Sequence, residues 1–145
     1  MVSSQKTLTT RLMTSKNSGY LLDTHTFLWV ISDSRKLSSS VREILLDKDN
    51  EIFLSKISYW EICLKASKDK IQLNEGWQTT FEKERLANRF QWLELNTDHC
   101  EKIISLEWHH KDPFDRLLVA QALSSQLTIL SCDEKLKTYE AEVLW

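Results

Sequence analysis

Four short apolar segments, and a shorter fifth one, alternate with stretches that have helical periodicity, and this alternation constrains the fold more than any other feature. The segments fall at residues 20–22, 52–54, 92–95, 127–130 and 143–144. Short apolar strands that alternate with one or two helices indicate an α/β domain with a mostly parallel sheet. Right-handed crossovers then place helices on both faces. We therefore predict a parallel sheet of four to five strands that is covered on both sides.

Capping residues mark where several of the helices are expected to begin. Ser38 is a predicted helix start, Thr97 is the predicted cap of a later helix, and Ser58 is expected to begin the helix that follows the second strand. Asp112 precedes Pro113, a pairing of an N-cap with a proline at the first helical position. Two further helices are expected from the spacing of the apolar residues within 27–31 and 77–86.

Composition limits the class of protein. The chain has 145 residues, of which 41% are hydrophobic and 28% charged, as expected for one globular domain. Only 2 Gly and 1 Pro argue against turn-rich sandwiches and barrels, and a net charge of −2 argues against a strongly basic nucleic-acid coat protein. Three widely spaced cysteines without a CxxC pair favour free thiols in the reducing cytoplasm. The sequence contains no apolar run of the ~18 residues that crossing a membrane requires.

The first nineteen residues differ from the rest of the chain. They are rich in Ser and Thr and carry Lys6, Arg11 and Lys16 but no acid. We interpret residues 1–19 as a disordered tail, or as the product of an upstream start codon with Met13 as the native start. The folded domain is predicted to span residues 20–145.

Four acidic residues occupy positions where acids are unexpected or where sites form. Asp23 and Asp133 follow the first and fourth strands, and Glu61 and Asp115 fall on or beside the apolar faces of two helices. Each has a structural alternative: Asp23 and Asp133 as N-caps, Glu61 as the partner of Lys65, and Asp115 as an acid near a helix start. Because sites in open α/β sheets form beyond the carboxyl ends of the strands, we expect the four to converge there.

Converging carboxylates repel one another and favour a bound cation. Mg²⁺ and Mn²⁺ prefer oxygen ligands, and such a site activates water and stabilises charge on a phosphate. The sequence has no Gly-rich phosphate loop, GxSxG elbow or HExxH spacing. Solvated or capping roles are therefore expected for the four histidines, His25, His99, His109 and His110.

Three motifs in order carry a resemblance to a known family. They are Leu-Leu-Asp-Thr-His at 21–25, Ser-x-x-Ser-x-Trp-Glu-Ile-x-x-Lys at 55–65 and His-His-Lys-Asp-Pro-Phe-Asp-Arg-Leu-Leu at 109–118, and the chain closes in Val-Leu-Trp. Together they resemble the PIN-domain family, and within it the VapC group of ribonuclease toxins from type II toxin–antitoxin systems. The resemblance covers residues 20–145 and excludes the tail.

This resemblance implies a three-layer α/β/α sandwich and an endoribonuclease that depends on Mg²⁺ or Mn²⁺. Asp23 and Asp115 would be the principal metal ligands, Glu61 a further ligand or a supporting group, and Asp133 the most peripheral acid. Ser131 stands where family members usually have Thr, and it keeps the hydroxyl.

Three more residues complete the expected site. Arg116 and Lys65 are candidate phosphate contacts, with plain salt bridges as an equal alternative for both. Asp112 is interpreted mainly as the cap of its helix, with a supporting role at the site.

The resemblance also implies partners: an RNA substrate, a small cognate antitoxin and a second copy of the chain in a homodimer. Two other functions stay open. One is a PIN-like module that binds an antitoxin without cleaving RNA. The other is a phosphatase with Asp23 as nucleophile, although such enzymes typically have Asp-x-Asp and the second position here is His25.

Overall fold

The computed structural model describes residues 19–145, and the predicted tail therefore lies almost wholly outside the described residues. Five parallel strands form one sheet in the order β3-β2-β1-β4-β5. The predicted parallel α/β fold is confirmed. The strands are β1 (Tyr20–Leu22), β2 (Ile52–Ser55), β3 (Phe90–Leu93), β4 (Thr128–Leu130) and β5 (Val143–Leu144).

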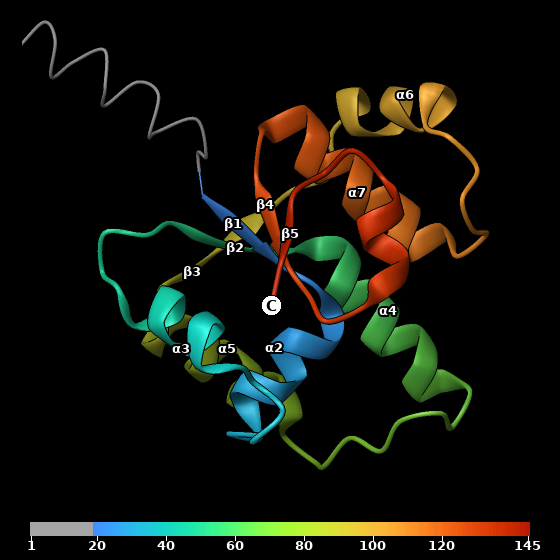
Figure 1. Cartoon of the computed structure of the whole chain (residues 1–145). Helices are drawn as coiled ribbons and strands as arrows, with labels where there is room; N and C mark the ends of the chain where they lie inside the picture. Colours follow the sequence, from blue (N-terminus) through green and yellow to red (C-terminus); the bar gives the residue numbers. More distant parts are fainter. Residues whose placement is uncertain (1–18) are drawn as a thin grey trace, which may run out of the picture.

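Helices cover both faces of the sheet (Figure 1). Leu21 and Leu22 show how the central strand serves both layers, because successive side chains of a strand point to opposite faces. Leu22 packs with Phe27 and Phe81 in one core, and Leu21 packs with Val119 in the other. The helices are α2 (Thr24–Ile31), α3 (Ser39–Leu46), α4 (Lys56–Ser67), α5 (Trp77–Ala87), α6 (Thr97–Ser105) and α7 (Pro113–Ser125), and η1 (Glu134–Thr138) is a 3₁₀ turn.

The strand order places a topological switch point between β1 and β4. From β1 the chain moves outward to β2 and β3, and then returns to the other side of β1 as β4. Leu22 pairs with Leu54 on one side and with Leu130 on the other. The residues that follow these strands therefore meet at one edge, where α/β proteins bind their ligands.

The predicted helix starts have mixed outcomes. Ser38 caps α3, and Asp112 caps α7 by accepting hydrogen bonds from the Phe114 and Asp115 N–H groups at 2.9 and 3.2 Å. Thr97 is not the cap but the first residue of α6, because the side chain of Asn96 accepts the capping hydrogen bond from the His99 N–H.

One helix and one strand are displaced by two residues from their predicted positions. Helix α4 begins at Lys56 and not at Ser58, because Ser55 ends β2 and also caps the helix by accepting a hydrogen bond from the Ile57 N–H. Strand β3 runs over Phe90–Leu93 and not over residues 92–95, because a left-handed residue, Arg89, ends the preceding turn and directs Phe90 into the core. None of the helices in the described part combines the length and apolar character needed to cross a membrane.

Candidate active site

The carboxyl edge of the sheet is centred on Asp23, directly after β1. Its side chain is only 7% exposed and caps α2, with Oδ1 accepting a hydrogen bond from the Thr26 N–H at 2.7 Å. Its other oxygen, Oδ2, accepts a hydrogen bond from the hydroxyl of Ser131, which follows β4. Asp23 therefore does act as an N-cap, but capping uses only one of its carboxylate oxygens. The second oxygen faces Ser131, on the other side of the switch point.

Ser131 connects Asp23 to Asp133. While its hydroxyl donates to Asp23, Ser131 Oγ accepts a hydrogen bond from the Asp133 N–H at 3.0 Å. Asp133 itself is half-buried and caps the 3₁₀ turn by accepting a hydrogen bond from the Lys135 N–H at 2.9 Å. One serine hydroxyl therefore fixes the two acids that follow neighbouring strands.

Removing this hydroxyl should destabilise the fold without creating a large cavity. We expect Ser131→Ala to lower the free energy of unfolding by about 2 kcal/mol, because a buried carboxylate oxygen and a backbone N–H each lose a partner. Ser124→Ala is the matched control, since Ser124 is exposed on α7 and surface substitutions of this kind change stability by less than about 0.5 kcal/mol. Urea denaturation measures both. Equal stability of the two variants would contradict the bridging role of Ser131.

Glu61 lies on the inner face of α4, as its position in the apolar stripe predicts. It is 6% exposed, and its Oε1 accepts a hydrogen bond from the hydroxyl of Thr24 at 2.6 Å. Its Oε2 lies 2.9 Å from Lys65 Nζ, and Ser58 Oγ lies 2.9 Å from Thr24 Oγ1. Lys65 therefore forms the i,i+4 ion pair with Glu61. Of its two predicted roles, this geometry shows the salt bridge and not the phosphate contact. Sequence reasoning assigned no role at the site to Thr24 or Ser58, although both belong to the quoted motifs.

Asp115 lies in the first turn of α7, and its side chain is 25% exposed. Burial, followed by the charge of Asp112, raises its pKa to about 6, with Asp133 contributing in the same direction and His110 opposing it. Desolvation and then the charge of Asp23 likewise raise the pKa of the Cys132 thiol. In both groups burial is the main cause of the raised pKa, and the charges of neighbouring acids add to it.

His110 holds Asp115 in place. Its Nε2 lies 3.2 Å from Asp115 Oδ2, and its Nδ1 lies 2.7 Å from the hydroxyl of Tyr139. The prediction of a solvated or capping histidine is wrong for His110, whose side chain is 14% exposed, whereas it is right for His99, which completes the capping box of α6. The contact with Tyr139 spans 29 positions of the chain, so no local pattern could have predicted it.

Arg116 has a different role from the phosphate contact suggested by its sequence position. It is 3% exposed, and its guanidinium donates hydrogen bonds to the backbone carbonyls of Glu107 and Leu106 at 2.7 and 3.2 Å. The Trp108 ring covers the guanidinium, with its centroid 3.8 Å from Arg116 Cζ. Because its donors are directed inward and its face is covered, Arg116 fixes the loop before α7 and is not available to a phosphate.

The donor chemistry of this edge fits a hard divalent cation. Carboxylate and hydroxyl oxygens predominate, and burial together with the charge of Asp112 disfavours an unpaired Asp115 carboxylate, which a bound cation would stabilise. Within residues 19–145, no three His, Cys, Asp or Glu side chains are grouped closely enough to hold a metal ion together. The four predicted acids therefore do not form a ready-made metal-binding cluster in the described part of the chain. The arrangement suits an ion such as Mg²⁺, which is usually held by one or two carboxylates and keeps several waters.

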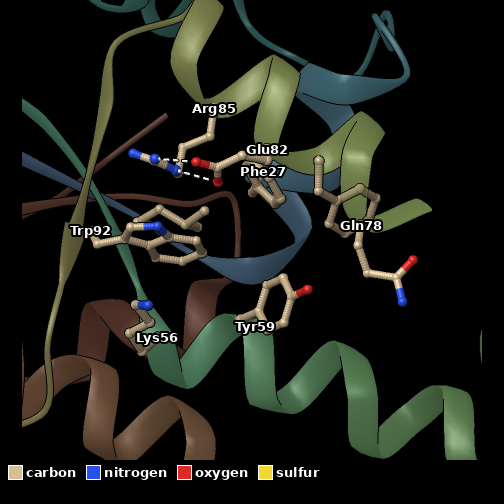
Figure 2. A pocket seen from close by; sticks show the side chains of 9 residues that line it. Phe27, Lys56, Tyr59, Gln78, Glu82, Arg85 and Trp92 are labelled. Atoms are coloured by element: carbon tan, nitrogen blue, oxygen red, sulfur yellow. Dashed lines mark hydrogen bonds and ion pairs between the residues drawn. The ribbon is translucent and has the colours of Figure 1, made fainter. Parts of the chain in front are cut away.

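A hollow of about 300 Å³ opens between α5 and the start of α4, and none of the four predicted acids lines it (Figure 2). Its wall includes Trp92, with Lys56 Nζ 4.4 Å from the ring centroid and the Arg85 guanidinium stacked nearby. Arg85 also forms an ion pair with Glu82, so its charge is already neutralised in part. The one carboxylate that lines this hollow, Glu82, is paired with Arg85, and the candidate site remains with Asp23.

The fold and the site together define the class of this protein, which is a parallel α/β domain with acidic residues around its switch point. The PIN domain family model matches residues 20–142, and the chain belongs to this family. The family prediction is confirmed, and PIN domains are generally nucleases. A comparison with curated protein sequences finds no match.

Solved structures share the fold at low sequence identity. VapBC2 from Rickettsia felis, bound to a DNA fragment from its promoter, has a TM-score of 0.64 at 18% identity, covering 86% of this chain and 96% of that one. A toxin–antitoxin complex from Klebsiella pneumoniae has a TM-score of 0.58 at 19% identity, covering 88% and 97%. FitAcB from Neisseria gonorrhoeae has a TM-score of 0.57 at 16% identity, covering 87% and 96%.

Proposed function

We propose that this protein is a metal-dependent endoribonuclease that acts as the toxin of a toxin–antitoxin pair. The observation that carries the proposal is the buried carboxylate of Asp23 at the switch point, held by Ser131 and flanked by the Thr24–Glu61 pair. Membership of a nuclease family and fold similarity to VapBC2 from Rickettsia felis support the same conclusion.

In this proposal Asp23 and Asp115 are the principal ligands of Mg²⁺ or Mn²⁺, with Glu61 and Asp133 supporting them. When bound, the cation supplies a water of lowered pKa and neutralises charge on the scissile phosphate and the leaving oxygen. Ser131 and the Thr26 N–H orient the Asp23 carboxylate, and His110 orients that of Asp115.

Three further residues hold the acidic side chains of the site in position. Lys65 and Thr24 hold Glu61 as a hydrogen-bonded carboxylate, which limits the repulsion it adds to the other acids. Asp112 supports the site indirectly, because it caps α7 and so positions the first turn that carries Asp115.

Cleavage of RNA with and without a divalent cation tests this function directly. We expect purified protein to cut total RNA in Mg²⁺ or Mn²⁺ and to lose this activity in EDTA, with recovery when the cation is restored. Mapping of 5′ ends after brief induction identifies the cleavage sequence. Cutting that survives chelation would contradict the proposal. Growth arrest on expression without any cleavage would favour the non-catalytic module.

We also propose that the partners are a cognate antitoxin and a second copy of the chain, and that the protein acts in the cytoplasm. The three cysteines are free, which is compatible with a reducing compartment.

A further inference from the structure

A second hollow, of about 320 Å³, lies between the end of α4 and the start of α7. Four lysines line it together with Glu61 and Asp112, so it adjoins the acidic edge. We call it the lysine hollow, and its basic residues are Lys65, Lys68, Lys70 and Lys111.

Three of these lysines form no ion pair in the described part of the chain. Lys65 pairs with Glu61, whereas Lys68, Lys70 and Lys111 are exposed and have no acidic partner within 4.0 Å among residues 19–145. The Asp112 carboxylate, on the same wall, already accepts the N–H groups at the start of α7. The lysine hollow therefore presents a local positive charge directly beside a site of negative charge.

This position matters because the protein as a whole does not attract polyanions. Its net charge is −2, and the acids around Asp23 repel a phosphate backbone until a cation is bound. A strand with one phosphate at the acidic edge places its neighbouring phosphates close by, where they need positive partners. Lysine ammonium groups bind phosphates as point charges without requiring a fixed geometry.

The rim of the lysine hollow also favours an unpaired strand. Trp60 is 56% exposed and packs edge-on against Phe114, with 5.1 Å between ring centroids, and Phe114 lines the hollow. Exposed aromatic rings beside a basic groove are the usual combination in proteins that bind single-stranded nucleic acid.

We propose that Lys68, Lys70 and Lys111 bind backbone phosphates of single-stranded RNA on one side of the scissile bond. This inference rests on the proposed function and goes beyond it, because it assigns the direction of the substrate from the acids toward the end of α4. It also moves the phosphate contact expected of Lys65 and Arg116 to three other lysines, of which Lys68 and Lys70 lie outside the quoted motifs.

The test compares two double substitutions that remove the same charge. Lys68→Gln/Lys70→Gln alters the lysine hollow, and Lys48→Gln/Lys83→Gln alters exposed positions after α3 and on α5. Both are made in the Asp23→Asn background, and binding of a fluorescein-labelled single-stranded RNA oligonucleotide is followed by anisotropy. Thermal melting verifies that every variant is folded.

We expect only the Lys68/Lys70 variant to bind more weakly, by about tenfold at 50 mM salt. Its log–log salt slope should become shallower by about 1.4, since each lost phosphate contact removes about 0.7 for a single strand. Lys68→Arg/Lys70→Arg should restore binding. Single-stranded DNA of the same sequence should show the same loss, because phosphate contacts do not distinguish the sugars. Equal losses in the test and control variants, or none in either, would overturn the inference.

Cleavage assays with Asp23 intact separate this inference from the proposed function. If the unmodified protein does not cut RNA with any divalent cation, the proposed function fails. If it cuts RNA and Lys68→Gln/Lys70→Gln leaves KM unchanged, only the assignment of the lysines fails. A raised KM with little change in kcat, and a similar effect of Lys111→Gln, supports it.

Discussion

Asp23→Asn should reduce RNA cleavage by about a thousandfold, the upper end of what removing one electrostatic contact from an active site costs. The carboxylate of Asp23 is 7% exposed at the switch point, where it faces Ser131. An amide has nearly the same shape, and its oxygen can still accept the Thr26 N–H that caps α2. The substitution therefore removes the negative charge needed to hold a cation while leaving the helix start in place.

The control for this prediction is Asp49→Asn, which makes the same chemical change at an exposed position. Initial rates on a defined RNA in Mg²⁺ measure both variants, and circular dichroism verifies their fold. We expect the control to retain the full rate. An Asp23→Asn protein that cuts within tenfold of the unmodified rate would exclude Asp23 as a principal ligand.

Asp115→Asn should have opposite effects on activity and stability. Cleavage should fall by at least about a hundredfold, because a proposed ligand loses its charge. Stability in EDTA at pH 8, however, should rise by about 1 kcal/mol. Burial and the charge of Asp112 raise the pKa of Asp115 to about 6, so the ionised form is disfavoured in the folded protein.

The pH dependence follows from the sign of this shift. Between the ordinary carboxyl pKa near 4 and about 6, the folded state binds more protons at Asp115 than the unfolded state does. Stability from this group is therefore lost as pH rises through that window and stays lost above it. Solvent around a side chain that is 25% exposed reduces the effect to about 1–2 kcal/mol. Asp115→Asn also removes a favourable interaction between a negative charge and the N-terminal end of α7, and this loss offsets part of the gain in stability.

Urea denaturation in EDTA at pH 4.5 and pH 8 tests this prediction. The advantage of Asp115→Asn should be clear at pH 8 and small at pH 4.5. Asp98→Asn is the matched control, because Asp98 is an exposed acid in the first turn of α6, and it should gain no stability at either pH. Added Mg²⁺ should stabilise the unmodified protein and not Asp115→Asn. A less stable Asp115→Asn protein at pH 8 would mean that the His110 contact outweighs desolvation.

Local patterns predicted most of the scaffold. The five apolar segments became five parallel strands, and Asp112 with Pro113 marked the start of α7. The inward position of Glu61 also followed from the apolar stripe of α4. Boundaries were less predictable, because Ser55 both ends a strand and caps a helix, and periodicity alone does not reveal a helix that begins without a loop.

The contacts that orient the acids could not be predicted in this way. Ser131 and Asp23 are separated by 108 positions, and Thr24 and Glu61 by 37. Sequence also gave Arg116 and Lys65 equal claims as phosphate contacts and salt-bridge partners. Tertiary packing buries the first among backbone carbonyls and pairs the second with Glu61.

By itself, then, the sequence determined the parallel α/β class and the set of acids that lie beyond strand ends or on inner helix faces. Both depend on periods of two and 3.6 residues, which are local properties of the chain. Only the tertiary structure decided which oxygens each acid presents and which lysines remain free beside them. Those outcomes depend on the strand order β3-β2-β1-β4-β5, which brings distant residues to one edge of the sheet.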